Sequence, residues 1–161
     1  MKHFNHRIIV RNSPPIVAMR YDRPTAVFAT NVVKWLIGHA NTDVNAKDDG
    51  GQTPLHYAIS EGHDDVVELL IGHTDVDVNA KDRLGRTPLH CAILKGHDDV
   101  VKRLIDHANI NVNTEDFSGR TPWDDAISGK CVDAAKLLLR HETFKPPHHR
   151  TRCSFDCSGE I

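Results

Sequence analysis

The chain has 161 residues and a formal net charge of −2 at pH 7. Its length suits one domain, and no apolar run approaches the ~18 residues needed to cross a bilayer. The charge is uneven, because residues 1–24 carry five Lys or Arg and one Asp, whereas residues 25–142 carry 12 Lys or Arg and 19 acidic residues. This acidic body argues against nucleic acid as the main ligand, since binding duplex phosphates needs a concentrated basic face.

Residues 1–23 form a basic segment, which we interpret as a flexible N-terminal arm. They lack the apolar core of a secretory signal. Pro14-Pro15 also interrupts any amphipathic helix of the kind found in transit peptides. A targeting peptide is the less favoured alternative.

From about residue 24 the sequence repeats with a step of 34 residues. The clearest copies are Gly51-Gln52-Thr53-Pro54-Leu55-His56, Gly85-Arg86-Thr87-Pro88-Leu89-His90 and Gly119-Arg120-Thr121-Pro122-Trp123-Asp124. A fixed step of this size is typical of solenoids, in which each unit buries its apolar face only against its neighbours. The predicted array spans residues 24–142, with units of about 24–45, 46–79, 80–113 and 114–142.

The unit 80–113 shows what each repeat encodes. Asp82-Arg83-Leu84-Gly85 fits a type I turn, after which Thr87 caps a helix that begins at Pro88. Gly96 ends this helix in a left-handed conformation. A second helix starts at Asp98, and we expect it to end near Asn109, again with a left-handed cap.

Neither helix is long enough to be stable alone, so stacking must supply the stability. The sequence therefore predicts an all-α, helix-turn-helix solenoid with short β-turn fingers, containing about three full repeats plus an N-terminal half repeat. The last unit departs from the pattern, because Asp124 replaces the motif histidine and Lys130 stands where Gly62 and Gly96 stand. Atypical terminal repeats are expected, since they cap the core.

The Thr-Pro-Leu-His motif, the Gly-His pair and the later Asp-Val-Asn-Ala motif resemble the ankyrin repeat. The resemblance implies that His56 and His90 are structural and bridge to the backbone of the neighbouring repeat. It also implies a non-catalytic protein-protein interaction module that binds through turn tips and the inner face of the first helices. The partner-binding residues carried over in this way are Asp49, Gln52, Ser60, Glu61, Arg83, Leu84, Arg86, Leu94, Lys95, Phe117, Ser118, Arg120 and Ser128.

Apolar side chains among arginines are typical of interface hot spots, so we expect a protein partner with an acidic patch. In the alternative interpretation, Arg86 and Arg120 pair with neighbouring Asp residues as solvated ion pairs, each contributing about 0–1 kcal/mol. Placement of Arg86 on the binding face predicts that Arg86→Glu leaves the melting temperature nearly unchanged. The oligomeric state is left open.

No Gly-rich phosphate loop, nucleophile elbow or paired-His zinc motif is present, so we expect neither an enzyme nor a cofactor.

Residues 143–161 are expected to form a disordered C-terminal tail. Within it, His148, His149, Cys153 and Cys157 are weak candidates for metal ligands, and a metal- or redox-responsive protein is one alternative function. A regulatory fragment of a larger protein is another. Four cysteines make no disulfide framework, which favours the cytoplasm, with the nucleus as an alternative.

Overall fold

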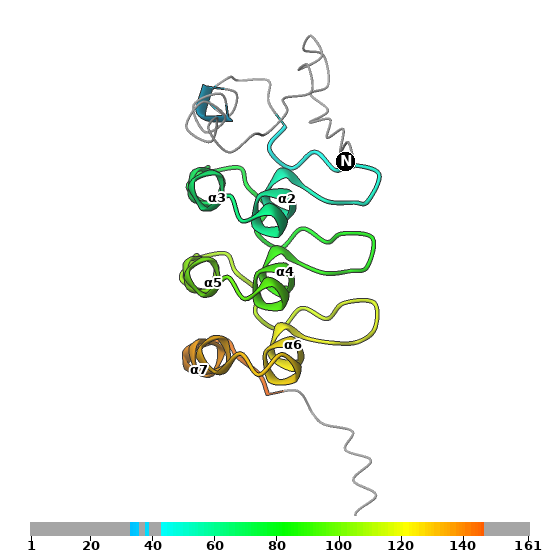
Figure 1. Ribbon diagram of the computed structural model, residues 1–161, viewed down its shortest axis with the longest axis vertical. Helices are drawn as coiled ribbons and strands as arrows, with labels where there is room; N and C mark the ends of the chain where they lie inside the picture. The colour runs from blue at the N-terminus through cyan, green and yellow to red at the C-terminus, as the bar shows by residue number, and fades with distance from the viewer. Residues whose placement is uncertain (1–32, 36–37, 39–42, 147–161) are drawn as a thin grey trace, which may run out of the picture.

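The computed structural model describes residues 33–35, 38 and 43–146, and this part forms a two-row stack of helices (Figure 1). One row contains α2 (Pro54–Glu61), α4 (Pro88–Lys95) and α6 (Pro122–Ser128), and the other contains α3 (Asp64–Ile71), α5 (Asp98–Ile105) and α7 (Val132–Arg140). The loops between units project from the side of the α2, α4 and α6 row (Figure 1). No strand is assigned among these residues, so the predicted all-α solenoid is confirmed.

Three sequence expectations lie mostly or wholly outside the described residues. They are the arm at 1–23, the half repeat at 24–45 and the tail at 143–161, of which residues 143–146 are described.

The first helix of each unit begins as the sequence predicts. Thr53, Thr87 and Thr121 are the N-cap residues of α2, α4 and α6, and each forms a capping box with the residue three positions later. Proline follows each threonine, where its missing N–H costs nothing. Gly62 and Gly96 end α2 and α4 with φ angles of 72° and 73°, which confirms the predicted left-handed caps.

The second helices end earlier than predicted. α5 ends at Ile105 and its C-cap, Asp106, is right-handed with φ −75°. The expected left-handed cap near Asn109 is therefore wrong. The reason is that His107 Nδ1 accepts a hydrogen bond from the Asn109 N–H at 3.2 Å. This bond fixes the backbone that follows α5, so no left-handed residue is needed there.

The last unit keeps the left-handed turn without a glycine. Lys130 has φ 56° and is the one non-glycine residue of the described part with a positive φ. A left-handed conformation costs a residue with a Cβ atom roughly 1–2 kcal/mol. Lys130, which stands where the earlier units have glycine, is therefore a strained residue in the last unit.

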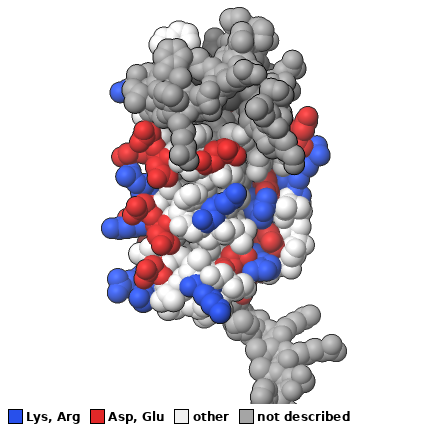
Figure 2. Space-filling view, viewed as in Figure 1, with Lys and Arg blue, Asp and Glu red and all other residues white. Residues whose placement is uncertain are grey.

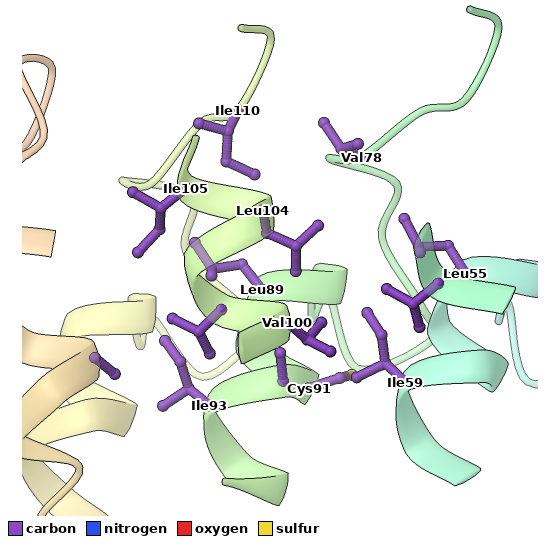
Figure 3. Close-up of a cluster of buried hydrophobic side chains, with 14 of the residues drawn as sticks. Leu55, Ile59, Val78, Leu89, Cys91, Ile93, Val100, Leu104, Ile105 and Ile110 are labelled. Carbon is purple, nitrogen blue, oxygen red and sulfur yellow. The ribbon is translucent and has the colours of Figure 1, made fainter. Parts of the chain in front are cut away.

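The core is one continuous cluster that runs through successive units. Its fully buried members include Leu55, Ile59, Leu89, Ile93 and Leu104. Figure 3 shows Leu89 and Ile93 of α4 close to Val100 and Leu104 of α5 in this cluster. The apolar positions that recur every 34 residues therefore meet one another, and this contact stabilises helices that are too short to persist alone.

Asparagine side chains connect each unit to the next. Asn45 Nδ2 donates to the Asp75 carbonyl at 2.6 Å, and Asn45 Oδ1 accepts from the Asp77 N–H at 2.7 Å. Asn79 makes the same pair of bonds one unit later. Asn113 bonds in this way to the Thr143 carbonyl and the Lys145 N–H. The contacts of the array therefore continue to Lys145, three residues past the predicted boundary at 142.

Candidate functional site: the finger–helix face

The fingers and the ends of the inner helices form one surface. We use the term finger–helix face for the turns 48–51, 82–85 and 116–119 together with the C-terminal turns of α2, α4 and α6 and the turn after each of these helices, which includes Lys130. Figure 1 shows the three fingers side by side, each beside the helix that follows it. The predicted partner-binding residues lie on these fingers, on the residue after each finger, and on the last turns of the inner helices.

Backbone contacts hold the fingers in place. The Gly85 N–H donates to the Asp82 carbonyl at 3.0 Å, which closes the predicted turn. Neighbouring fingers are joined by Arg83 N–H to Gly50 O and by Phe117 N–H to Leu84 O, both at 3.0 Å. Gly85 has φ 77°, and a Cβ atom added there would lie 2.7 Å from the Phe117 nitrogen. Only glycine therefore fits, and the fingers approach one another closely.

Three apolar side chains of this face are exposed, as the sequence suggested. Leu84, Leu94 and Phe117 are 57%, 52% and 75% exposed. Leu84 and Phe117 lie on successive fingers, and Leu94 lies on the last turn of α4. Exposed aromatic and aliphatic groups of this kind serve as contact anchors at protein interfaces.

Arg86 does not project freely from this face. Its Nε and Nη2 atoms donate to Asp82 Oδ2 at 3.0 and 2.8 Å, and Asp82 Oδ1 accepts from the Leu84 and Arg86 backbone amides. The Asp82 side chain is only 2% exposed. Burial alone would raise the pKa of Asp82, but the hydrogen bonds from Arg86 and the backbone bring it below its ordinary value. The alternative interpretation is therefore right that Arg86 pairs with a neighbouring Asp, but the pair is not a solvated one, because the Asp82 carboxylate is buried.

Arg120 belongs to the same motif one unit later but has a different partner. Its Nη2 atom lies 2.7 Å from Oδ1 of Asp125, whose side chain is 4% exposed. Asp125 stands at the position of Cys91 and Tyr57 in the earlier units. Its Oδ2 atom is buried without a hydrogen-bond partner among the described residues. Burial raises the pKa of the Asp125 carboxyl, and Arg120 offsets only part of that rise.

The motif histidines connect units, as the resemblance implied. The Thr53 N–H donates to His56 Nδ1 at 3.3 Å, so the ring proton lies on Nε2, which donates to the Arg86 carbonyl at 3.1 Å. His90 repeats this arrangement between Thr87 and the Arg120 carbonyl. Burial lowers the pKa of both imidazoles. Both rings are therefore neutral structural groups rather than metal ligands or catalytic bases.

Three cations of the face remain without an ion pair to any described carboxylate. Arg83, Lys95 and Lys130 are exposed and are absent from the ion pairs of the described residues. The other predicted residues vary in exposure: Asp49, Glu61, Ser118 and Ser128 are exposed, and Gln52 and Ser60 are half-buried. Figure 2 shows acidic and basic side chains interspersed along the edge beside α3, α5 and α7, with further basic side chains nearer the middle.

Sequence reasoning missed Asp82 and Asp125 as the buried partners of the two arginines. Asp125 had a detectable signal, because a carboxylate replaces Cys91 at a register position that faces inward. Lys130 was noted as a glycine replacement but not as a member of the face. For Asp82 the repeat motif gave no signal, since the equivalent Asp48 is exposed and Asp116 is half-buried.

The candidates for metal binding and thiol chemistry lie partly within the described residues. It contains no group of three or more His, Cys, Asp or Glu residues that could hold a metal ion. Burial raises the pKa of the Cys91 thiol to about 11, so this thiol stays protonated and is a poor nucleophile. The metal candidates His148, His149, Cys153 and Cys157 lie outside the described residues. No helix of the described residues is long and apolar enough to span a bilayer.

Comparison with known proteins agrees with the repeat geometry. A family model for ankyrin repeats, found in three copies, matches residues 11–82 and 74–146. A search of curated proteins found no match. Because the family model covers most of the chain and the described part has the matching stacked helix pairs, the chain belongs to the ankyrin repeat family.

Proposed function

We propose that this chain is a non-catalytic binding module that holds a partner protein on its finger–helix face. Ankyrin repeats are generally protein-protein interaction modules. The observation that carries the proposal is that three exposed apolar side chains, Leu84, Leu94 and Phe117, share this face with cations that have no ion pair among the described residues. An apolar centre bordered by polar and charged groups is the usual anatomy of an interface.

The fixed geometry of the fingers supports the same proposal. Because backbone hydrogen bonds join neighbouring fingers, the surface requires little ordering when a partner binds. Arg83 and Lys95 follow or precede exposed leucines in the sequence and have no ion pair in the described part, which favours a partner whose contacting surface is partly acidic. The free thiols Cys91 and Cys131 fit a reducing compartment such as the cytoplasm or nucleus.

Affinity capture from cell lysate tests the site with variants chosen from the geometry. The binding-face variant carries Arg83→Glu, Leu94→Ser, Lys95→Glu and Phe117→Ser, and it leaves the structural Arg86 and Arg120 intact. The control variant carries Lys102→Glu and Val132→Ser, which are exposed positions on the α5 and α7 row. Circular dichroism confirms that both variants are folded.

We expect the wild-type chain and the control to retain the same proteins, and the binding-face variant to lose them. Retention of the same proteins by all three forms, or capture of nothing by the wild-type chain, would reject the proposed site.

A further inference from the structure

One arginine of the last unit has a choice between two carboxylates. Arg120 Nη2 lies 2.7 Å from Asp125 Oδ1 on α6 and donates to the Ser128 hydroxyl at 3.0 Å. Asp116 of the same finger has no ion pair among the described residues, and its Oδ2 accepts no hydrogen bond from them. Arg120 therefore compensates the charge of the buried Asp125 and not that of Asp116.

The preceding unit shows the other position that this arginine can take. The two fingers have the same backbone bonds, because the Asp82 N–H donates to the Arg86 carbonyl at 3.0 Å and the Asp116 N–H donates to the Arg120 carbonyl at 2.8 Å. Oδ1 of each aspartate also accepts from the amide of the arginine four residues later. Arg86 nevertheless donates to Asp82 Oδ2 through both Nε and Nη2. The backbone of the finger thus permits the arginine to bind its own finger aspartate.

A single helix position accounts for the difference between the two units. Cys91 stands there in the second unit, and Asp125 stands there one step of 34 residues later. Because burial raises the pKa of the Cys91 thiol, α4 offers Arg86 no competing negative charge. In the last unit the ionised Asp125 holds Arg120 on α6. The charge at this position therefore selects where the arginine lies.

The Asp125 carboxylate is poorly stabilised in its charged form. Its Oδ2 atom is buried without a hydrogen-bond partner among the described residues. The groups that act on its charge are Arg120 and Asp116 of the finger and His90 and Cys91 of α4, whereas α7, which also packs against α6, supplies none of them. Burial raises the pKa of Asp125 above the ordinary 3.8, Asp116 adds to the rise, and Arg120 and His90 oppose it. Asp125 therefore takes up a proton at a higher pH than an exposed aspartate.

We propose that Arg120 is a proton-controlled switch, which binds Asp125 when that carboxylate is ionised and moves to Asp116 when it is protonated. In the acidic state Arg120 takes the position of Arg86, with Nε and Nη2 donating to the finger carboxylate. Both positions belong to one side chain, so the proton shifts an equilibrium between two states. The move releases the Ser128 hydroxyl and neutralises the finger, which changes the finger–helix face of the last unit.

Nuclear magnetic resonance of the full-length chain tests the switch at constant pH. Asp125→Cys removes the charge and introduces the residue that the second unit has at this position. In the wild-type chain Arg120 Nε makes no hydrogen bond in the described part, whereas Arg86 Nε does. At pH 7 we expect the Arg120 Nε–H of the variant to exchange with water about tenfold more slowly than in the wild-type chain. Adding Asp116→Asn should abolish this protection, because an amide nitrogen replaces the accepting oxygen.

The matched control is Asp133→Asn, which removes an exposed carboxylate of α7 and should leave the exchange of Arg120 unchanged. A pH titration of the wild-type chain needs no variant to fold. In it, the Asp125 carboxyl and the Arg120 Nε resonances should change together, with one midpoint above the ordinary aspartate pKa of 3.8. Unchanged exchange in Asp125→Cys, protection that survives Asp116→Asn, or titration of Asp125 without a change at Arg120 would overturn the inference. None of these measurements needs the partner, so the switch and the proposed function can fail separately.

Discussion

The substitution Arg86→Glu separates a structural arginine from a binding arginine. In the wild-type chain Asp82 Oδ2 accepts two hydrogen bonds from the Arg86 guanidinium, and the Asp82 side chain is 2% exposed. Glutamate at position 86 removes both bonds and adds a second negative charge. Removing one partner of a buried pair costs about 3–5 kcal/mol. Because the Arg86 side chain is 29% exposed, solvent screening reduces this to about 2–4 kcal/mol.

For an array of this size, we therefore expect the melting temperature to fall by roughly 10–25 °C. Thermal and urea unfolding at pH 7, followed by circular dichroism, measure the change. Arg83→Glu is the matched control, because Arg83 is exposed on the same finger and has no ion pair in the described part. This control should stay within about 0.5 kcal/mol of the wild-type chain. Equal stability of the two variants would refute the assignment of Arg86 to the scaffold.

Three other perturbations follow from the same contacts. His56 and His90 have pKa values below the ordinary 6.5 when folded, so the unfolded chain binds more protons. The free energy of unfolding is therefore highest above about pH 6.5 and falls at lower pH. Urea midpoints measured from pH 5 to 8 should show this fall, and His90→Gln should make it smaller. Lys130→Gly should raise the free energy of unfolding by about 1 kcal/mol, because it removes the left-handed strain; an unchanged urea midpoint would contradict this. Leu104→Ala, at a fully buried position, should cost about 2–5 kcal/mol, and a smaller loss in thermal unfolding would argue against tight packing there.

Local signals in the sequence predicted most of the fold. The Thr-Pro pairs and turn glycines act through their own backbone, so their positions determine where α2 and α4 begin and end. The second-helix ends were mispredicted because they depend on a side chain. His107 satisfies the Asn109 N–H, and propensity rules for caps do not include that bond.

The candidate site was harder to predict because it depends on contacts between units. Arg86 and Arg120 follow the same Asp-x-x-Gly-Arg motif, yet the first pairs with Asp82 and the second with Asp125. The difference originates at the helix position occupied by Cys91 in one unit and by Asp125 in the next. The same motif therefore gives different surfaces, and the three-dimensional neighbours decide which carboxylate each arginine pairs with.

The second and last units of the array also differ in how well their apolar side chains are covered. Ile93 and Ile105 are 2% and 6% exposed, whereas the equivalent Ile127 and Leu139 of the last unit are 55% and 58% exposed. That unit also lacks the motif histidine and carries the strained Lys130. Stability in a stacked array is a sum of unit and neighbour terms, so we expect the last unit to open more readily than the second. Because Phe117 and Lys130 belong to it, a partner that contacts them in the closed form stabilises this unit. Binding and completion of the fold are thus coupled at this end of the array.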